Sequence, residues 1–327
     1  MKVLFIGGTG NISSASSRLV TVKGIDLYHL NRGLTKSEIP HVKSIVGDIN
    51  KPNELLQLKK HDWDVVVNWI AFTPQDIERD IALFKGKTKQ YIFISSASAY
   101  QKPLSYPIIT ESTPLHNNLA LYSNNKIKCE ERLTKAYRDE NFPMTIVRPS
   151  LTYDTVIPIA IGGFKEYTTA DRILKGKPII IHGDGTSLWT VTHADDFAKG
   201  LVGLLGLKQA IGHAFHITSD EILNWNMIYK ILADSLNCEL NAVHITSDFI
   251  GKIEPMFIEK LQGDKAESVI FDNSKIKIFV PEFTATIPFS AGIKRTLHWF
   301  DENPKMKFIN PETNQKIENI LKAYHKL

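Results

Sequence analysis

The chain has 327 residues, of which 43% are hydrophobic and 23% charged, and its formal net charge is +4. These are ordinary values for a soluble protein of one large or two interlocking domains. Two cysteines without a C-x-x-C pair exclude a disulfide framework, and no window approaches the 18 apolar residues of a membrane span. We therefore expect a soluble, cytoplasmic protein with no membrane partner, and the diffuse basic charge does not select nucleic acid.

The first 150 residues alternate between predicted strands and predicted helices. Strands are expected at residues 2–6, 25–30, 44–49, 64–72, 90–98 and 144–149, and helices at 13–24, 52–60, 73–86 and 122–140. Near-continuous apolar strands that alternate with helices are typical of a parallel sheet covered on both faces. The sequence thus predicts an α/β, doubly wound (Rossmann) domain over residues 1–150.

The alternation of predicted strands and helices becomes less regular after residue 150. We expect helices near residues 168–174, 193–207, 224–236 and 310–327, with a strand just before the Gly-Asp-Gly turn at 183–185. Residues from about 190 to 217 are predicted to complete the sheet. Residues 151–189 and 218–327 are predicted to form a smaller, interleaved α+β lobe that binds the substrate.

The stretch GGTGNIS at residues 7–13 joins the first strand to the first helix. Gly7 would make the tight exit, Gly10 would let the backbone approach a phosphate, and the helix N-terminus would face the anion. A plain strand-to-helix turn is the alternative. The dinucleotide pattern has a third glycine where this chain has Ser13. That position governs packing, so we expect the serine to be tolerated, and its added hydroxyl could donate to phosphate. The expected cofactor contacts here are Gly7, Thr9, Gly10, Asn11 and Ile12.

The end of the second strand bears on the choice between NAD and NADP. An acidic residue there would bind the ribose hydroxyl of NAD, whereas an arginine suits the 2′-phosphate of NADP. The chain has neutral Asn31 and then Arg32, with Lys36 nearby, which favours NADP slightly. Solvated loop charges are an equal alternative for the two cations. Asp48 could meet the adenine amino group or simply cap a turn.

Tyr122 and Lys126 lie four residues apart on one helix face. An ammonium near a tyrosine lowers its pKa, which suits general acid–base chemistry. Ser96 follows a strand, and ligands bind at the carboxyl ends of strands in such sheets, so its hydroxyl could hold a substrate oxygen. The alternatives are a chance surface pair on the helix, and serines that satisfy strand-end backbone groups.

Six motifs occur in the order seen in the extended short-chain dehydrogenase/reductase superfamily, which includes NAD-dependent epimerases and dehydratases. They are GGTGNIS, GDI, ISSASAY, YSNNK, VRPSLTY and GDGTSLWTVTHADDFAKGL. The chain resembles this superfamily over almost its whole length. The resemblance implies an NAD(P)-dependent oxidoreductase or epimerase that moves hydride at a hydroxyl or carbonyl carbon of a small substrate, with sugar derivatives among the candidates.

The resemblance also implies roles for individual residues. Tyr122 would be the acid–base, Ser96 would orient the substrate oxygen, and Lys126 would bind the ribose and tune Tyr122. Arg148 and Pro149 would border the nicotinamide. The remaining cofactor contacts that it implies are Ile49, Ile70 and Ala71.

The chain departs from the superfamily at the substrate positions. Related dehydratases carry an Asp-Glu pair where this chain has Ala97 and Ser98, so we do not expect a dehydratase. Arginines that clamp a substrate diphosphate are replaced by Trp189 and Leu261, which puts a nucleotide-sugar substrate in question. Ser98 and Trp189 are expected to line the substrate pocket, although Trp189 could instead pack in the core.

A rival function comes from one branch of the superfamily. The NRG and DNSK stretches, at residues 31–33 and 272–275, resemble chloroplast stem-loop RNA-binding proteins. Scattered lysines support RNA binding weakly, and we do not expect nucleic acid as a partner. No histidine or cysteine spacing indicates a metal site. The resemblance implies a homodimer as one possibility, and the high charge of the helix at 122–140 outside its apolar stripe weakens the case for it without removing it.

Overall fold

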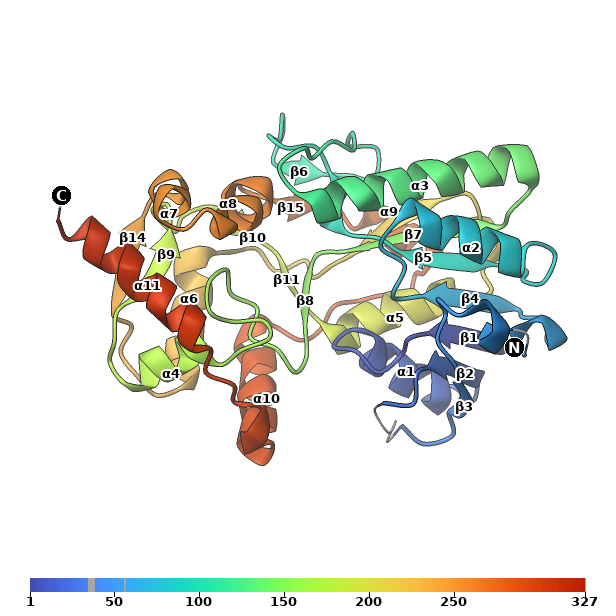
Figure 1. Ribbon diagram of the computed structural model, residues 1–327, viewed down its shortest axis with the longest axis horizontal. Helices are drawn as coiled ribbons and strands as arrows, with labels where there is room; N and C mark the ends of the chain where they lie inside the picture. Colours follow the sequence, from blue (N-terminus) through green and yellow to red (C-terminus); the bar gives the residue numbers. More distant parts are fainter. Residues whose placement is uncertain (35–38, 56, 327) are drawn as a thin grey trace.

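A parallel sheet forms the centre of the molecule. The computed structural model describes residues 1–34, 39–55 and 57–326. In this part of the chain, the central sheet has seven strands in the order β12-β7-β5-β4-β1-β2-β3 (Figure 1). Its strands are β1 (Lys2–Ile6), β2 (Asp26–Asn31), β3 (Lys43–Val46), β4 (Val65–Asn68), β5 (Tyr91–Ile94), β7 (Met144–Pro149) and β12 (Ala214–Ile217). The strand order reverses beside β1, which opens a crevice at the carboxyl ends of the strands. The predicted doubly wound α/β fold is confirmed.

Helices cover both faces of this sheet (Figure 1). Val3 and Phe5 of β1 pack in the core on the side of α1 and α5. Leu4 and Ile6 pack on the opposite side, in the core that includes residues of α2 and α3. Because successive strand residues point to opposite faces, a strand buried on both sides must be continuously apolar. The covering helices are α1 (Ser13–Val22), α2 (Pro74–Phe84), α3 (Leu121–Glu140) and α5 (Ala194–Leu204).

The start of α2 agrees with its sequence signal. Thr73 caps the helix by accepting the Asp76 N–H, and the Asp76 carboxylate accepts the Thr73 N–H in return. Pro74 occupies the first turn, where a missing N–H costs nothing. This reciprocal capping fixes the direction in which the chain leaves β4.

Several sequence predictions in this half need correction, and among them the strands expected at residues 44–49 and 90–98 end at Val46 and Ile94. The helix expected at residues 52–60 is two short 3₁₀ helices, η1 (Pro52–Leu55) and η2 (Leu58–Lys60). Nine residues are marginal for an α-helix, and Leu55 and Leu58 are buried in the core instead. The strand expected to reach residue 72 ends at Asn68, whose side-chain oxygen accepts the Ile70 N–H at 2.8 Å and turns the chain.

The rest of the chain forms a second body beside the sheet, to the left in Figure 1. Its core contains Trp189 and Trp225. Residues Ile276, Val280 and Phe283, expected in the substrate lobe, return to pack on the sheet core. No helix in the described ranges is both long and apolar enough to cross a membrane. The larger elements here are α4 (Thr168–Leu174), β9 (Ile179–His182), α6 (Trp225–Ser235), β14 (Ala242–Ile245), α7 (Ser247–Ile253), α8 (Met256–Lys260), a π-helix (Leu261–Lys265), α10 (Phe289–Glu302) and α11 (Pro311–Tyr324), whereas α9 (Ser274–Phe279) lies against β12 of the sheet.

Short strands hold this second body together and join it to the first. β9 pairs with β14 in parallel, and the two-residue β10 pairs with β13. β11 follows β10 and pairs with β8, and β15 pairs with β6. These pairs bring segments far apart in sequence to the carboxyl edge of the main sheet. The short strands in the last three of these pairs are β6 (Ile108–Ile109), β8 (Leu151–Tyr153), β10 (Leu188–Trp189), β11 (Val191–His193), β13 (Leu223–Asn224) and β15 (Ile270–Phe271).

Candidate functional site

The glycine turn connects β1 to α1 at the carboxyl edge of the sheet. Gly7 and Gly8 have φ values of +89° and +126°, a region that favours glycine. A Cβ atom on Gly8 would lie 2.7 Å from the His29 ring, so no side chain fits there. The sequence analysis did not single out Gly8, although the double glycine was its signal. Thr9 and Gly10 are exposed at the tip of the turn.

Ser13 and Asn11 hold the turn in shape. The Ser13 hydroxyl accepts the Gly10 N–H at 2.8 Å and lies 3.4 Å from the Gly10 carbonyl, its acceptor within the turn. Donation of this hydroxyl to a phosphate stays a prediction. The Asn11 amide donates to the Thr152 carbonyl, and its oxygen accepts the Asp154 N–H, both at 2.9 Å. The Asn11 side chain is thus committed to the loop after β8, and only its backbone stays available to a cofactor.

The predicted ribose and adenine contacts lie around the ends of β2 and β3. Asn31 is the last residue of β2. In the amide orientation that satisfies the neighbouring acceptors, its side-chain nitrogen donates to the Leu30 carbonyl at 3.0 Å. Arg32 is exposed, and Lys36 lies outside the described residues. The Asp48 carboxylate accepts the Asn50 N–H at 2.9 Å. Asp48 therefore caps a turn, which the sequence analysis gave as the alternative to an adenine contact. Ile49 is buried.

Lys126 is buried beneath the strand ends. Its ammonium donates to the carbonyls of Ala71 at 2.7 Å and Ile94 at 2.8 Å. It also lies 5.7 Å from the ring centroid of Tyr122. Burial lowers the pKa of Lys126 to about 8. Of the two predicted neighbours on this loop, Ala71 is buried and Ile70 is 42% exposed at the surface of the crevice.

Tyr122 stands at the start of α3 and lines the main cavity. Burial raises its pKa above the ordinary value, and interaction with Ser96 lowers it in part. The sequence analysis expected Lys126 to lower this pKa. In the structure the Lys126 ammonium donates to two carbonyls, and the burial of Tyr122 outweighs the other influences on its pKa.

Ser96 belongs to a chain of hydroxyl groups. Its Oγ lies 2.9 Å from the Ser98 Oγ, which accepts a hydrogen bond from Ser123 at 2.8 Å. Ser123 was missed by sequence reasoning, although it directly follows Tyr122. The three serines form a polar row beside the tyrosine, so a substrate hydroxyl at Ser96 would join an existing network.

Arg148 does not line the cavity, contrary to the expectation that it borders the nicotinamide. Its guanidinium is buried and binds the Glu130 carboxylate, with the shortest contact at 2.6 Å. The Ser95 hydroxyl donates to the same carboxylate. This pair ties α3 to β7 beneath the site. Pro149, the next residue, does line the cavity.

The main cavity has a volume of about 660 Å³ and lies between the sheet and the second body. We call its two sides the sheet wall and the lobe wall. The sheet wall comprises Ile12, Ser96, Ser98, Tyr122, Ser123 and Pro149, and the lobe wall comprises Trp189, Lys260, Asp264, Lys265 and Val269. The structure therefore brings the predicted Ser96, Ser98, Tyr122, Pro149 and Trp189 to one cavity.

The two substrate-clamp positions differ in the structure. Trp189 lines the cavity and also packs on Trp225, with 5.4 Å between ring centroids, so its pocket and packing roles coexist. Leu261 is fully buried in the core of the second body and does not line the cavity.

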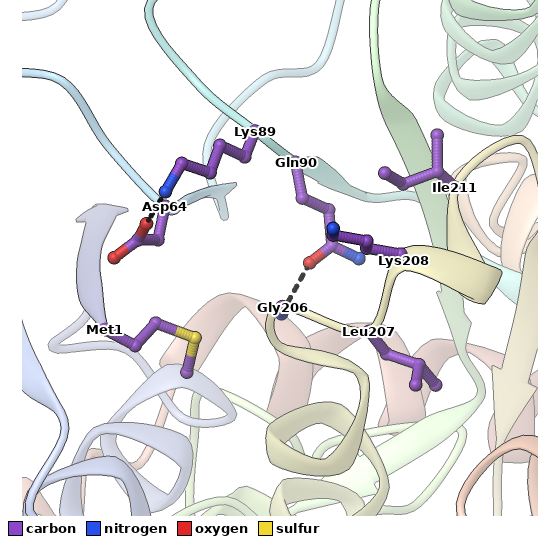
Figure 2. Close-up of a pocket in the computed structure, with 8 residues that line it drawn as sticks. All are labelled: Met1, Asp64, Lys89, Gln90, Gly206, Leu207, Lys208 and Ile211. Carbon is purple, nitrogen blue, oxygen red and sulfur yellow. Dashed lines mark hydrogen bonds and ion pairs between the residues drawn. The ribbon is translucent and has the colours of Figure 1, made fainter.

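A second cavity, of about 590 Å³, lies at the opposite edge of the sheet. Figure 2 shows that three of its polar side chains already have partners: Lys89 pairs with Asp64 at 2.7 Å, and Gln90 accepts the Gly206 N–H at 2.8 Å. These residues precede or flank the amino ends of the strands, away from the glycine turn. We therefore place the candidate site in the main cavity. No group of three or more metal-ligating side chains occurs within the described ranges.

The chain is similar to known proteins over most of its length. The model of the NAD-dependent epimerase/dehydratase family matches residues 3–218. The 2′-dehydrokanamycin reductase of Streptomyces kanamyceticus is 22% identical over 251 residues, which cover 76% of this chain and 70% of that protein. The chloroplast stem-loop binding protein of 41 kDa b of Arabidopsis thaliana is 24% identical over 250 residues, covering 71% and 62%.

Among solved structures, the UDP-glucuronic acid 4-epimerase of Bacillus cereus, in complex with UDP-glucuronic acid and NAD, has a TM-score of 0.73. It is 18% identical, and the match covers 93% of this chain and all of that one. At this identity the likeness concerns the fold.

Proposed function

The chain belongs to the NAD-dependent epimerase/dehydratase family, and from that premise we propose that it transfers hydride between a nicotinamide dinucleotide and a hydroxyl or carbonyl carbon of a small substrate. One observation carries the proposal: Ser96 and Tyr122 line the same cavity as Ile12 of the glycine turn, above the buried Lys126. Hydride donors and proton donors must meet at one substrate carbon and its oxygen, and this cavity is where they would meet.

The glycine turn fits a dinucleotide pyrophosphate. Gly8 leaves no space for a side chain, and no side chain caps the N-terminus of α1 at Ile12. Uncapped N–H groups at a helix start favour an anion. A bound nicotinamide would supply the hydride acceptor or donor. The chain's own residues supply the rest of the chemistry.

Tyr122 gives or takes the proton of the substrate oxygen, and Ser96 holds that oxygen. The raised pKa of Tyr122 favours the protonated hydroxyl, which suits proton donation to a carbonyl being reduced. Lys126 keeps a positive charge close to the ring, which favours the phenolate when the reaction runs toward oxidation.

The residues beside the site, Ala97 and Ser98, argue against elimination of water as the reaction. Elimination of water needs an acid and a base beside the reacting carbon. The chain has buried Ala97 there, and Ser98 hydrogen-bonded to its neighbouring serines. We infer a reductase or an epimerase. A reductase consumes one reduced cofactor per product, whereas an epimerase returns the hydride and leaves the cofactor balance unchanged.

The deciding experiment is Tyr122→Phe. We expect kcat to fall about 10²- to 10⁴-fold while cofactor affinity stays within twofold, because the ring remains and only the proton donor is lost. Tyr137→Phe, on the same helix and outside the cavity, is the control and should match the parent chain. Unchanged kcat in Tyr122→Phe would contradict the mechanism.

We further propose that the cofactor is NADP, from the exposed Arg32 at the end of β2. Arg32→Ala should weaken NADPH binding about tenfold and leave NADH binding unchanged. Titration of both cofactors measures this, and equal losses for NADPH and NADH would refute the role of Arg32. The cytoplasm is our proposal for the location, consistent with Cys129 and Cys238 as free thiols.

RNA binding is the second candidate, and the stem-loop binding relative is the observation that favours it. The test is RNA affinity at several salt concentrations, because phosphate contacts give a steep salt dependence. Salt-sensitive, submicromolar binding by a chain that does not bind NAD(P) would favour this function over hydride transfer.

A further inference from the structure

The lining of the main cavity carries more positive than negative charge. Its described residues include four lysines and two carboxylates, so two positive charges are in excess. Cavities lined by one sign of charge concentrate ligands of the opposite sign. The charged lining residues are Lys102, Lys165, Glu259, Lys260, Asp264 and Lys265.

Lys102 is the most unusual of these residues, because its side chain is only 4% exposed. Its ammonium donates to the Asp264 carbonyl at 3.1 Å. The carboxylate of Glu267 is 4.0 Å away and already accepts the Leu104 N–H. Burial lowers the pKa of Lys102. A buried ammonium without a close carboxylate is costly, and an anion in the cavity would offset that cost.

Trp189 gathers two of these lysines. The ammonium of Lys102 lies 5.9 Å from the Trp189 ring centroid, and that of Lys265 lies 5.8 Å from it. The indole N–H of Trp189 is buried without a hydrogen-bond partner among the described residues. The Trp189 ring in the lobe wall therefore has two ammonium groups near it and an N–H donor of its own that is unpaired among the described residues.

The π-helix at Leu261–Lys265 fixes these groups in place. The Gly263 carbonyl accepts the Asn117 amide at 2.6 Å, and the Lys265 carbonyl accepts the Trp225 indole at 3.1 Å. π-helices are rare and frequently occur at functional sites. Because side chains from elsewhere hold its carbonyls, this wall is set before any ligand arrives.

We propose that the substrate of the reaction inferred above carries one anionic group, a carboxylate or a single phosphate, which binds between Lys102 and Lys265 beside Trp189. Asp264 already pairs with Lys265 at 2.5 Å, so the charge that lacks a close partner is that of Lys102, and one anion satisfies it. The role of this anion in the reaction rests on the proposed function; its binding does not.

The test uses the full chain saturated with NADP⁺ or NAD⁺, so that the glycine turn is occupied. Inorganic phosphate and acetate are titrated by calorimetry at fixed ionic strength. We expect a millimolar Kd for the preferred anion, weakened at least fivefold by Lys102→Met and retained by Lys102→Arg. Whichever probe binds more tightly distinguishes a phosphate from a carboxylate. Lys128→Met, exposed on α3, is the matched control and should bind as the parent does.

Two results would overturn the proposal. One is the same anion affinity, or none, in the parent, Lys102→Met and Lys128→Met. The other is UDP binding far more tightly than phosphate and without change in Lys102→Met, which would indicate a nucleotide diphosphate. If Lys102→Met fails to retain cofactor binding, Lys265→Met is measured in its place with the same expectation. Because no turnover is needed, anion binding and the Tyr122→Phe result can each fail alone.

Discussion

The sheet wall and the lobe wall of the main cavity draw their residues from the chain in different ways. The sheet wall uses short consecutive stretches, such as residues 95–98 after β5 and residues 122–123 at the start of α3. The lobe wall joins Trp189 to residues between 260 and 269, more than 70 positions later, and Lys102 reaches it from the loop after β5. Local motifs therefore reveal the first wall, whereas tertiary packing alone creates the second.

The strongest test of the sheet side is Gly8→Ala. The residue has φ +126°, and a Cβ there would collide with the His29 ring at 2.7 Å. We expect a loss of about 3 to 4 kcal/mol in the free energy of unfolding, from backbone strain and overpacking together. Chemical denaturation measures it, and cofactor binding should be lost as the turn deforms.

Gly24→Ala is the control for Gly8→Ala. Gly24 also has a positive φ, +69°, but a Cβ there would meet nothing within 4 Å. We expect a cost of about 1 kcal/mol and normal cofactor binding. Equal losses in the two variants would show that strain, and not the contact with His29, limits this turn.

A buried histidine lies behind each wall, and both make the fold acid-sensitive. Burial lowers the pKa of His29, under the glycine turn, to about 4, and does the same for His182, whose ring contacts the Lys265 carbonyl. An unfolded histidine titrates near pH 6.5. Between pH 6.5 and 4 the unfolded chain therefore binds more protons, and stability falls as the pH falls.

Each histidine should contribute about 3 kcal/mol to this acid loss, the equivalent of its pKa shift. His29→Gln and His182→Gln should each flatten the fall in unfolding free energy between pH 6.5 and 4. The readout is the slope against pH, which is independent of any constant cost of the substitution. An unchanged slope in both variants would contradict the buried neutral rings.

Much of the fold was predictable because its signals are local. A strand buried on both faces must be continuously apolar, which the sequence shows directly. The order of Thr73, Pro74 and Asp76 likewise indicates where α2 begins. The prediction of an α-helix at residues 52–60 was wrong, because burial of Leu55 and Leu58 overrides a weak helical pattern. Extents of strands were also too long, since a side chain such as Asn68 can end one early.

The candidate site divides in the same way. Ser96, Tyr122 and Lys126 follow from spacing and strand position, and the structure brings them together, although their roles stay predictions. Lys102 gave no signal, because an isolated lysine is usually solvated. Nor did the sequence indicate that Arg148 turns away to Glu130, since either partner could lie anywhere along the chain.

Asn117 tests whether the two walls act separately. It is buried, and its amide donates to the Ser98 carbonyl at 2.9 Å and to the Gly263 carbonyl at 2.6 Å. Asn117→Ala should cost about 1 to 2 kcal/mol of stability and raise KM for the substrate, while cofactor affinity is unchanged. Asn118→Ala, at the exposed neighbouring position, should alter none of these. A parallel loss of cofactor affinity in Asn117→Ala would show that the walls are coupled.

The smallest effect is expected at Ser13, where the dinucleotide pattern has its third glycine. The Ser13 hydroxyl accepts the Gly10 N–H at 2.8 Å and is buried within the turn. Ser13→Gly should cost about 1 kcal/mol of stability, from the lost hydrogen bond and the flexible residue. It also frees the Gly10 N–H for a phosphate oxygen, so cofactor affinity should stay equal or rise by less than about threefold. Titration of NAD(P)H with the parent and the variant measures this, and a fall of tenfold or more would mean that the serine itself contacts the cofactor.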